Sequence, residues 1–178
     1  MRKVTELSLW NATLHHVQRH PSTASGLARV LERKAKASVR KSGDPLPEAL
    51  STWIASVVEK AKEAGHIDDT RLATAKARTL RARGKSGRAV SAALRAKGVS
   101  SDVIADVAAA AEPDADRTAA WTLARKKKLG PYREAADRKA LRQKDLAAMA
   151  RSGFGYGLAA QIIDAEEPPD GPPLTVWG

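Results

Sequence analysis

The chain has 178 residues, enough for one domain or a series of small ones, and a formal net charge of +11. Aromatic residues make up only 4% of it and alanine is abundant, which disfavours a sheet protein and predicts an all-α fold. The absence of cysteine excludes disulfides and thiolate chemistry and is typical of a protein from a reducing compartment.

The excess of positive charge favours partners that are anionic, namely nucleic acid, an acidic protein surface or an anionic membrane. No apolar run approaches the roughly 20 residues that cross a bilayer. The first 16 residues also lack the uninterrupted apolar stretch of a secretory signal. We therefore expect a cytoplasmic protein that has no membrane partner.

Residues 1–64 predict a first unit of three helices, at about 5–20, 22–39 and 47–64, with a linker at 40–47. Ser22 or Thr23 is expected to cap the second helix. Each helix carries apolar residues at helical spacing, which predicts a buried stripe. These residues are Leu7, Trp10, Leu14 and Val17 in the first helix, Leu27, Val30 and Leu31 in the second, and Trp53, Ile54, Val57 and Val58 in the third.

Residues 65–112 predict a second unit, which begins with an acidic pair. Asp68 and Asp69 can cap a helix, because a short carboxylate accepts hydrogen bonds from the free N–H groups of the first turn. Glycines at 84, 87 and 98 divide the rest into two more helical runs. The apolar positions expected to be buried are Leu72, Ala73, Ala77 and Leu80, then Val90, Ala93 and Leu94, then Val103, Ile104 and Val107.

Residues 113–167 predict a third unit, and residues 168–178 a disordered tail, because its prolines and glycines exclude a helix. The second and third units superpose with an offset of 55 residues, which pairs Gly98 with Gly153 and Leu94 with Met149. The first unit matches the second at an offset of 63, although Ala35 stands where the glycine is expected. Three tandem three-helix repeats predict an elongated, curved array.

The motifs resemble those of one known family. The stretch from Ile67 to Ile104 has an acidic pair followed by Arg, an R-x-R-G-K turn and an L-R-x-K-G-V ending, and it is similar to the central repeat of the RecX family. Leu72 replaces the usual Phe and keeps an apolar position. Residues 119–133 and 142–156 resemble the last repeat of RecX proteins, and the resemblance spans about residues 7 to 166.

No residues predict catalysis, a cofactor or a metal site. Gly84-Lys85-Ser86 lacks the earlier glycine and the strand of a phosphate-binding loop. His16 and His20 have helical spacing but no Glu or Cys nearby. The pairs Asp68/Asp69 and Asp114/Asp116 precede predicted helices and are explained by capping. We therefore expect a protein that is not an enzyme.

The binding prediction falls on basic residues that lack neutralising acids. A single basic run often marks only a solvated helix, but here several follow one another, and residues 65–99 hold nine basic residues with no acid after Asp69. The predicted basic face for a partner or DNA comprises Arg71, Arg78, Arg81, Arg83, Lys85, Arg88, Arg95, Arg125, Lys126, Lys127 and Lys128. Trp10, Trp53 and Trp121 are expected in the core, and Trp177 is unexplained.

The resemblance to RecX implies a monomeric regulator that lies in the groove of a RecA filament on single-stranded DNA. It would inhibit ATP hydrolysis, strand exchange and the coprotease activity of RecA, and so restrain recombination, DNA repair and the SOS response. Single-stranded or double-stranded DNA is a possible direct partner. One alternative is a helix-turn-helix DNA-binding transcriptional regulator, in which residues 86–108 would enter DNA. The other is a helical scaffold whose charge serves only solubility.

Overall fold

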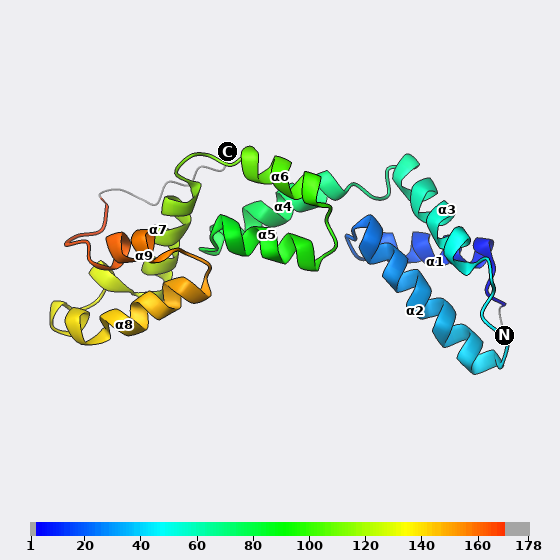
Figure 1. Ribbon diagram of the computed structural model, residues 1–178, viewed down its shortest axis with the longest axis horizontal. Coiled ribbons are helices and arrows are strands. Elements are labelled where there is room, and N and C mark those ends of the chain that lie inside the picture. Colours follow the sequence, from blue (N-terminus) through cyan, green and yellow to red (C-terminus); the bar gives the residue numbers. More distant parts are fainter. Residues whose placement is uncertain (1–2, 170–178) are drawn as a thin grey trace. The chain divides into compact units, whose positions relative to one another are not determined.

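The computed structural model describes residues 3–169 of the chain, and these form nine α-helices, one 3₁₀ helix and no strand (Figure 1). The elements are α1 (Glu6–Val17), α2 (Ala24–Ser42), α3 (Leu50–Glu63), α4 (Asp69–Ala82), α5 (Gly87–Ala96), α6 (Ser101–Ala109), α7 (Ala115–Lys127), η1 (Gly130–Tyr132), α8 (Ala135–Arg151) and α9 (Tyr156–Ile163). The all-α prediction is confirmed. None of the described helices is both long enough and apolar enough to cross a membrane. The predicted tail from residue 170 on, including Trp177, lies outside the described residues.

The chain packs as two compact units. Among the described residues, the first comprises 3–73 together with 95–103, and the second comprises 74–94 together with 104–169. The predicted repeat boundaries, after residues 64 and 112, fall in the loops before α4 and α7. The helices of the predicted second repeat thus contribute to both units, and the division into three repeats stays a prediction.

In the first unit, α1, α2 and α3 pack around one apolar core (Figure 1). Thr23 caps α2 by accepting a hydrogen bond from the Gly26 N–H, as one of the two predicted alternatives. The helix runs to Ser42, three residues beyond the predicted end, and stops at Gly43, whose φ of 78° a glycine adopts without strain. Leu27, Leu31 and Ala35 follow one another at i, i+4 and are buried.

The buried face of α1 differs from the predicted stripe. Leu7 is 69% exposed, whereas Leu9 and Thr13 are buried. The helix begins at Glu6, after the Thr5 cap, and ends at Val17 rather than residue 20. Thr13 can be buried because its hydroxyl donates to the Leu9 carbonyl at 3.0 Å, which satisfies the polar group within the helix. Trp10 is half-buried against this core, with the Lys60 ammonium 4.6 Å from its ring centroid.

In the second unit, α7, α8, α9 and η1 share the other apolar core. Met149 and Phe154 are buried in this core. The residues 55 positions earlier, Leu94 and Val99, are also buried, although they lie outside it. The matched glycines 153 and 98 both have positive φ, 94° and 81°. The residues that the offset of 55 pairs are thus alike in burial and in backbone conformation at these positions.

A buried carboxylate holds η1 against α8. Asp145 is fully buried, and it accepts two hydrogen bonds of 2.7 Å from the Arg133 guanidinium and one of 2.9 Å from the Gly130 N–H. Burial raises the pKa of Asp145, but the hydrogen bonds from Arg133 and Gly130 outweigh it, so that the pKa lies below its ordinary value. This contact determines where the chain turns after the basic end of α7.

Replacing Asp145 with Ala should lower the free energy of unfolding by about 3 kcal/mol, because it leaves the Arg133 guanidinium without its partner in a poorly hydrated site. Urea denaturation measures this loss. Asp164→Ala is the matched control, since it removes the more exposed pair with Arg142 and should cost less than about 1 kcal/mol. Because the pKa of Asp145 is lower in the folded chain, its contribution should be complete above about pH 4 and disappear as the pH falls further. Equal losses for the two variants would contradict this role.

Candidate partner-binding surface

The C-terminal half of α7 lies directly against the turn between α4 and α5. At Gly84 in that turn, with φ of 78°, an added Cβ would stand 2.7 Å from the Leu123 Cβ of α7. One turn of helix further on, the Lys126 ammonium donates to the Ala82 carbonyl at 2.6 Å. Two stretches that are about 40 residues apart in sequence thus meet, and both are rich in basic residues.

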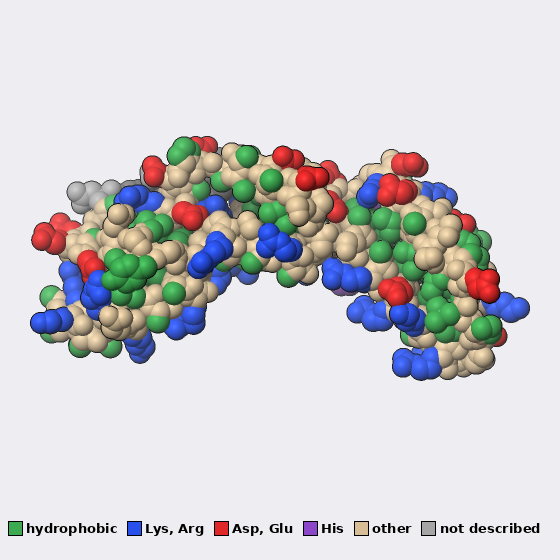
Figure 2. Space-filling model, in the orientation of Figure 1, with side chains coloured by type: hydrophobic (Ala, Val, Ile, Leu, Met, Phe, Trp, Pro, Cys, Tyr) green, Lys and Arg blue, Asp and Glu red, His purple; other side chains and the backbone are tan. Residues whose placement is uncertain are grey.

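This contact brings seven of the predicted basic residues onto adjoining segments. We refer to them as the basic cluster, which consists of Arg83, Lys85 and Arg88 from the α4–α5 segment and Arg125, Lys126, Lys127 and Lys128 from the end of α7. All are exposed except Lys85, which is half-buried, and none forms an ion pair with a described carboxylate. On the face shown in Figure 2, Lys and Arg side chains gather over α5, whereas carboxylates lie over α6.

The two halves of the basic cluster differ in their relation to the helix dipoles. The run at the end of α7 is stabilised locally, because a helix C-terminus favours positive charge. Arg88 instead stands in the first turn of α5, where the dipole disfavours a cation, and that turn contains no acidic residue. Local stability therefore explains the α7 run but not Arg88, and the unfavourable position of Arg88 points to a binding role.

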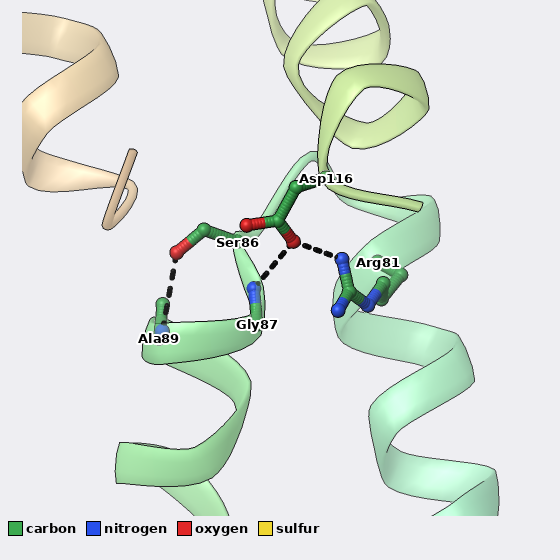
Figure 3. A network of polar contacts seen from close by, with 5 residues as sticks. All are labelled: Arg81, Ser86, Gly87, Ala89 and Asp116. Atoms are coloured by element: carbon green, nitrogen blue, oxygen red, sulfur yellow. Dashed lines mark hydrogen bonds and ion pairs between the residues drawn. The ribbon is translucent and has the colours of Figure 1, made fainter. Parts of the chain in front are cut away.

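The remaining predicted basic residues lie on α4 and α5. Arg71, Arg78 and Arg95 are exposed. Arg81 is instead only 15% exposed and pairs with Asp116, from the first turn of α7 (Figure 3). The same carboxylate oxygen accepts the Gly87 N–H at 2.8 Å. Arg81 is thus held inside the protein, and a partner could reach it only by breaking this pair.

The predicted capping aspartates take different roles. Asp68 caps α4 by accepting the Arg71 N–H at 2.8 Å. Asp69 does not cap its own helix; its carboxylate accepts the Ala24 N–H at 2.9 Å, at the start of α2. Asp114 makes no capping hydrogen bond, and Asp116 serves α5 rather than α7. Asp68 is thus the only one of the four that caps the helix it precedes, whereas Asp69 and Asp116 bind the first N–H group of a helix elsewhere in the chain.

An open cleft of about 440 Å³ adjoins the end of α7. It is lined by Arg125, Lys128, Tyr132, Arg133, Glu134 and Asp137. Arg133 is already bound to Asp145, so the remaining two cations face two carboxylates. The cleft therefore has no preference for one sign of charge. The members of the basic cluster that do not line it are the stronger candidates for binding an anionic partner, namely Arg83, Lys85, Arg88, Lys126 and Lys127.

The histidines take structural positions in the described part of the chain. His16 Nε2 forms a hydrogen bond of 2.8 Å with the Ser22 hydroxyl, and its ring contacts that of His20. Burial and the neighbouring His20 lower the pKa of His16. Between residues 3 and 169, no three His, Asp or Glu side chains are grouped so that they could hold a metal ion.

Comparison with known proteins identifies the family. A family model described as "RecX, second three-helix domain" matches residues 68–107. The regulatory protein RecX of Myxococcus xanthus is 42% identical over 166 residues, which cover 92% of this chain and 88% of that protein. The chain belongs to the RecX family. RecX of Agrobacterium fabrum is 29% identical over 153 residues, 86% of this chain and 80% of that protein.

The fold agrees with this assignment. A crystal structure of a regulatory protein RecX superposes with a TM-score of 0.62 at 18% identity, covering 90% of this chain and 72% of that one. The resemblance read from the sequence motifs is confirmed. The residues matched by the RecX family model include α4, α5 and most of α6, and hence the α4–α5 half of the basic cluster but not the α7 half.

The contact at Gly84 can be tested with a matched pair of glycines. Gly43 and Gly84 have the same φ of 78°, but an added Cβ at Gly43 would have nothing within 4 Å. Gly43→Ala should therefore cost only the backbone strain, about 1 kcal/mol. Gly84→Ala should cost about 2 kcal/mol more, because the new methyl group collides with the backbone of Leu123. Thermal denaturation of both variants measures the difference, and equal costs would show that α7 does not press on this turn.

Proposed function

We propose that this RecX-family protein restrains a RecA recombinase by binding in the groove of the RecA filament on single-stranded DNA. Membership of the RecX family supports the choice of partner. The observation that carries the proposal is the basic cluster, seven cations from two segments without an ion-paired carboxylate. The position of Arg88, where the dipole of α5 disfavours a cation, supports a role for the basic cluster beyond solubility.

The binding mode follows from the arrangement of charge. Each exposed cation contributes little alone, since a surface ion pair is typically worth about 0–1 kcal/mol. Many such contacts on one chain add up, because after the first contact the others form at a high effective concentration. A filament repeats the same surface along its axis and suits such a ligand. On this proposal the protein acts as a monomer in the cytoplasm, without cofactor or catalysis, and its cations contact RecA carboxylates or DNA phosphates.

The direct test is ATP hydrolysis by RecA on single-stranded DNA, with this protein added at substoichiometric amounts. We expect the rate to fall, because bound protein blocks the filament groove and limits growth of the filament. Binding of the protein to the same DNA without RecA is measured in parallel by fluorescence anisotropy. Full ATPase activity, under conditions where electron microscopy shows that filaments form, would overturn the proposal. Tight DNA binding without any effect on RecA would favour the helix-turn-helix alternative instead.

The basic cluster is tested by charge reversal at Arg88. In the first turn of α5 the helix dipole favours a glutamate, but the Asp116 carboxylate at the same helix start repels it, so Arg88→Glu should change the free energy of unfolding by less than about 1 kcal/mol. The concentration for half-inhibition of RecA should nevertheless rise, by about fivefold. A variant that keeps its stability yet binds less well separates a binding role from a structural one.

Arg117→Glu is the matched control for this substitution. Arg117 is exposed in the first turn of α7, outside the basic cluster, and receives the same change of two charges. Its contacts with polar groups are long, 4.0 Å to the Asp114 carboxylate and 3.5 Å to the Gln161 side chain, so their loss should cost little. The control should inhibit RecA like the unaltered protein. If the two variants lose inhibition equally, only the net charge matters, and the assignment of the basic cluster is wrong.

A further inference from the structure

Each of the two compact units contains a junction between predicted repeats, and the two junctions share one design. The first junction lies in the first unit, where the Asp69 carboxylate accepts the Ala24 N–H at 2.9 Å. The Thr23 hydroxyl donates to the Lys97 carbonyl at 2.7 Å. Next to it, an added Cβ on Gly98 would stand 2.7 Å from the Ser25 hydroxyl. The start of α2 is thus enclosed by the first turn of α4 and the glycine turn after α5.

In the second unit, the second junction repeats these contacts. The Asp116 carboxylate accepts the Gly87 N–H at 2.8 Å (Figure 3). The Ser86 N–H donates to the Ser152 carbonyl at 3.1 Å. An added Cβ on Gly153 would stand 2.3 Å from the Ser86 hydroxyl. The start of α5 is thus enclosed by the first turn of α7 and the glycine turn after α8.

Some residues of the two junctions match by sequence offset, whereas Asp69 and Asp116 are 47 residues apart and correspond only by their place in the first turn of α4 and of α7. Thr23 and Ala24 correspond to Ser86 and Gly87 at the offset of 63. The carbonyl and glycine they meet, at 97 and 98, correspond to 152 and 153 at the offset of 55. The offsets were set by apolar residues and by the glycines at 98 and 153, so the hydrogen bonds at the two helix starts are the independent part of this recurrence.

The contacts also divide one task between two repeats. The first N–H groups of a helix have no partner within the helix. At α5 the Ser86 hydroxyl accepts the Ala89 N–H, and Asp116 accepts the Gly87 N–H. At α2, Thr23 and Asp69 accept the Gly26 and Ala24 N–H groups in the same way. Each cap is completed only when the following repeat is docked.

We propose that Asp116 is a positioning residue, which docks α7 on α5 and so places the basic run at the far end of α7 beside Lys85 and Arg88. Its carboxylate serves the α5 N-terminus and Arg81 at once, which a neutral residue cannot do equally well. It fixes one end of a helix about 20 Å long, whose other end rests on Gly84 and Ala82. For its effect on inhibition this inference rests on the proposed function, but the docking itself does not.

The docking is tested by distance measurement in the free protein. The chain has no cysteine, so spin labels can be attached to introduced cysteines at Ala92 on α5 and Ala147 on α8, both exposed and both in the second unit. Asp116→Ala should widen the distribution of label distances by double electron–electron resonance, while far-UV circular dichroism keeps most of its helical signal. Asp116→Asn keeps an oxygen for the Gly87 N–H and loses the ion pair, so it should give an intermediate width.

Asp114→Ala is the matched control, since this aspartate lies two residues away, is 85% exposed and makes no capping hydrogen bond. It should leave the distribution unchanged. The same variants are then compared as inhibitors of RecA, where Asp116→Ala should require a severalfold higher concentration and Asp114→Ala should not. An unchanged distance distribution in Asp116→Ala would overturn the positioning role. Failure of the unaltered protein to inhibit RecA would overturn the proposed function and leave the docking result standing.

Discussion

The free N–H groups at the start of α2 and α5 impose the constraint on which much of this structure depends. A hydroxyl on the preceding residue satisfies one of them, at Thr23 and at Ser86. A carboxylate from the next predicted repeat satisfies another. Because the acceptor comes from elsewhere in the chain, formation of the helix end and docking of the next repeat are coupled. Within each unit, two predicted repeats are thereby joined by a polar contact of defined geometry.

The glycine turns after α5 and α8 are part of the same two junctions. A carbonyl can meet the capped helix only if the residue after it has no side chain, because Cβ atoms at positions 98 and 153 would collide with Ser25 and Ser86. Both glycines also have the positive φ that ends the preceding helix. One residue type thus provides the helix stop and the close approach. The first predicted repeat has Ala35 at the matching position, and α2 continues through it to Ser42.

The sequence was sufficient to predict the helical class, because helices depend on periodicity and on glycine. Of the 21 apolar positions expected to be buried in the first two predicted repeats, ten are buried, ten are half-buried and Leu7 is exposed. The sequence could not predict a side-chain contact whose partner lies far away in the chain. The position of Asp69 marks a helix start, but nothing local indicates that its carboxylate binds α2, 45 residues away. Arg81 has the spacing of an exposed face, yet Asp116 draws it inward. In α1 the apolar residues surround the helix so broadly that spacing could not distinguish Leu7 from Leu9, and the packing against α3 decided between them.

The basic residues likewise differ in whether their charges have a partner within the fold. Arg81 and Arg133 have carboxylate partners, and their charges are used within the fold. The run from Arg125 to Lys128 is favoured by the end of α7, so its presence alone is weak evidence for a partner. Arg88 forms no ion pair with a described carboxylate, and the dipole of α5 disfavours a cation at its position. A charge that weakens its own helix is better evidence of binding than a count of cations. The junction at Asp116 connects the α7 run to a binding role, because it holds those cations beside Arg88, whose position folding alone does not explain.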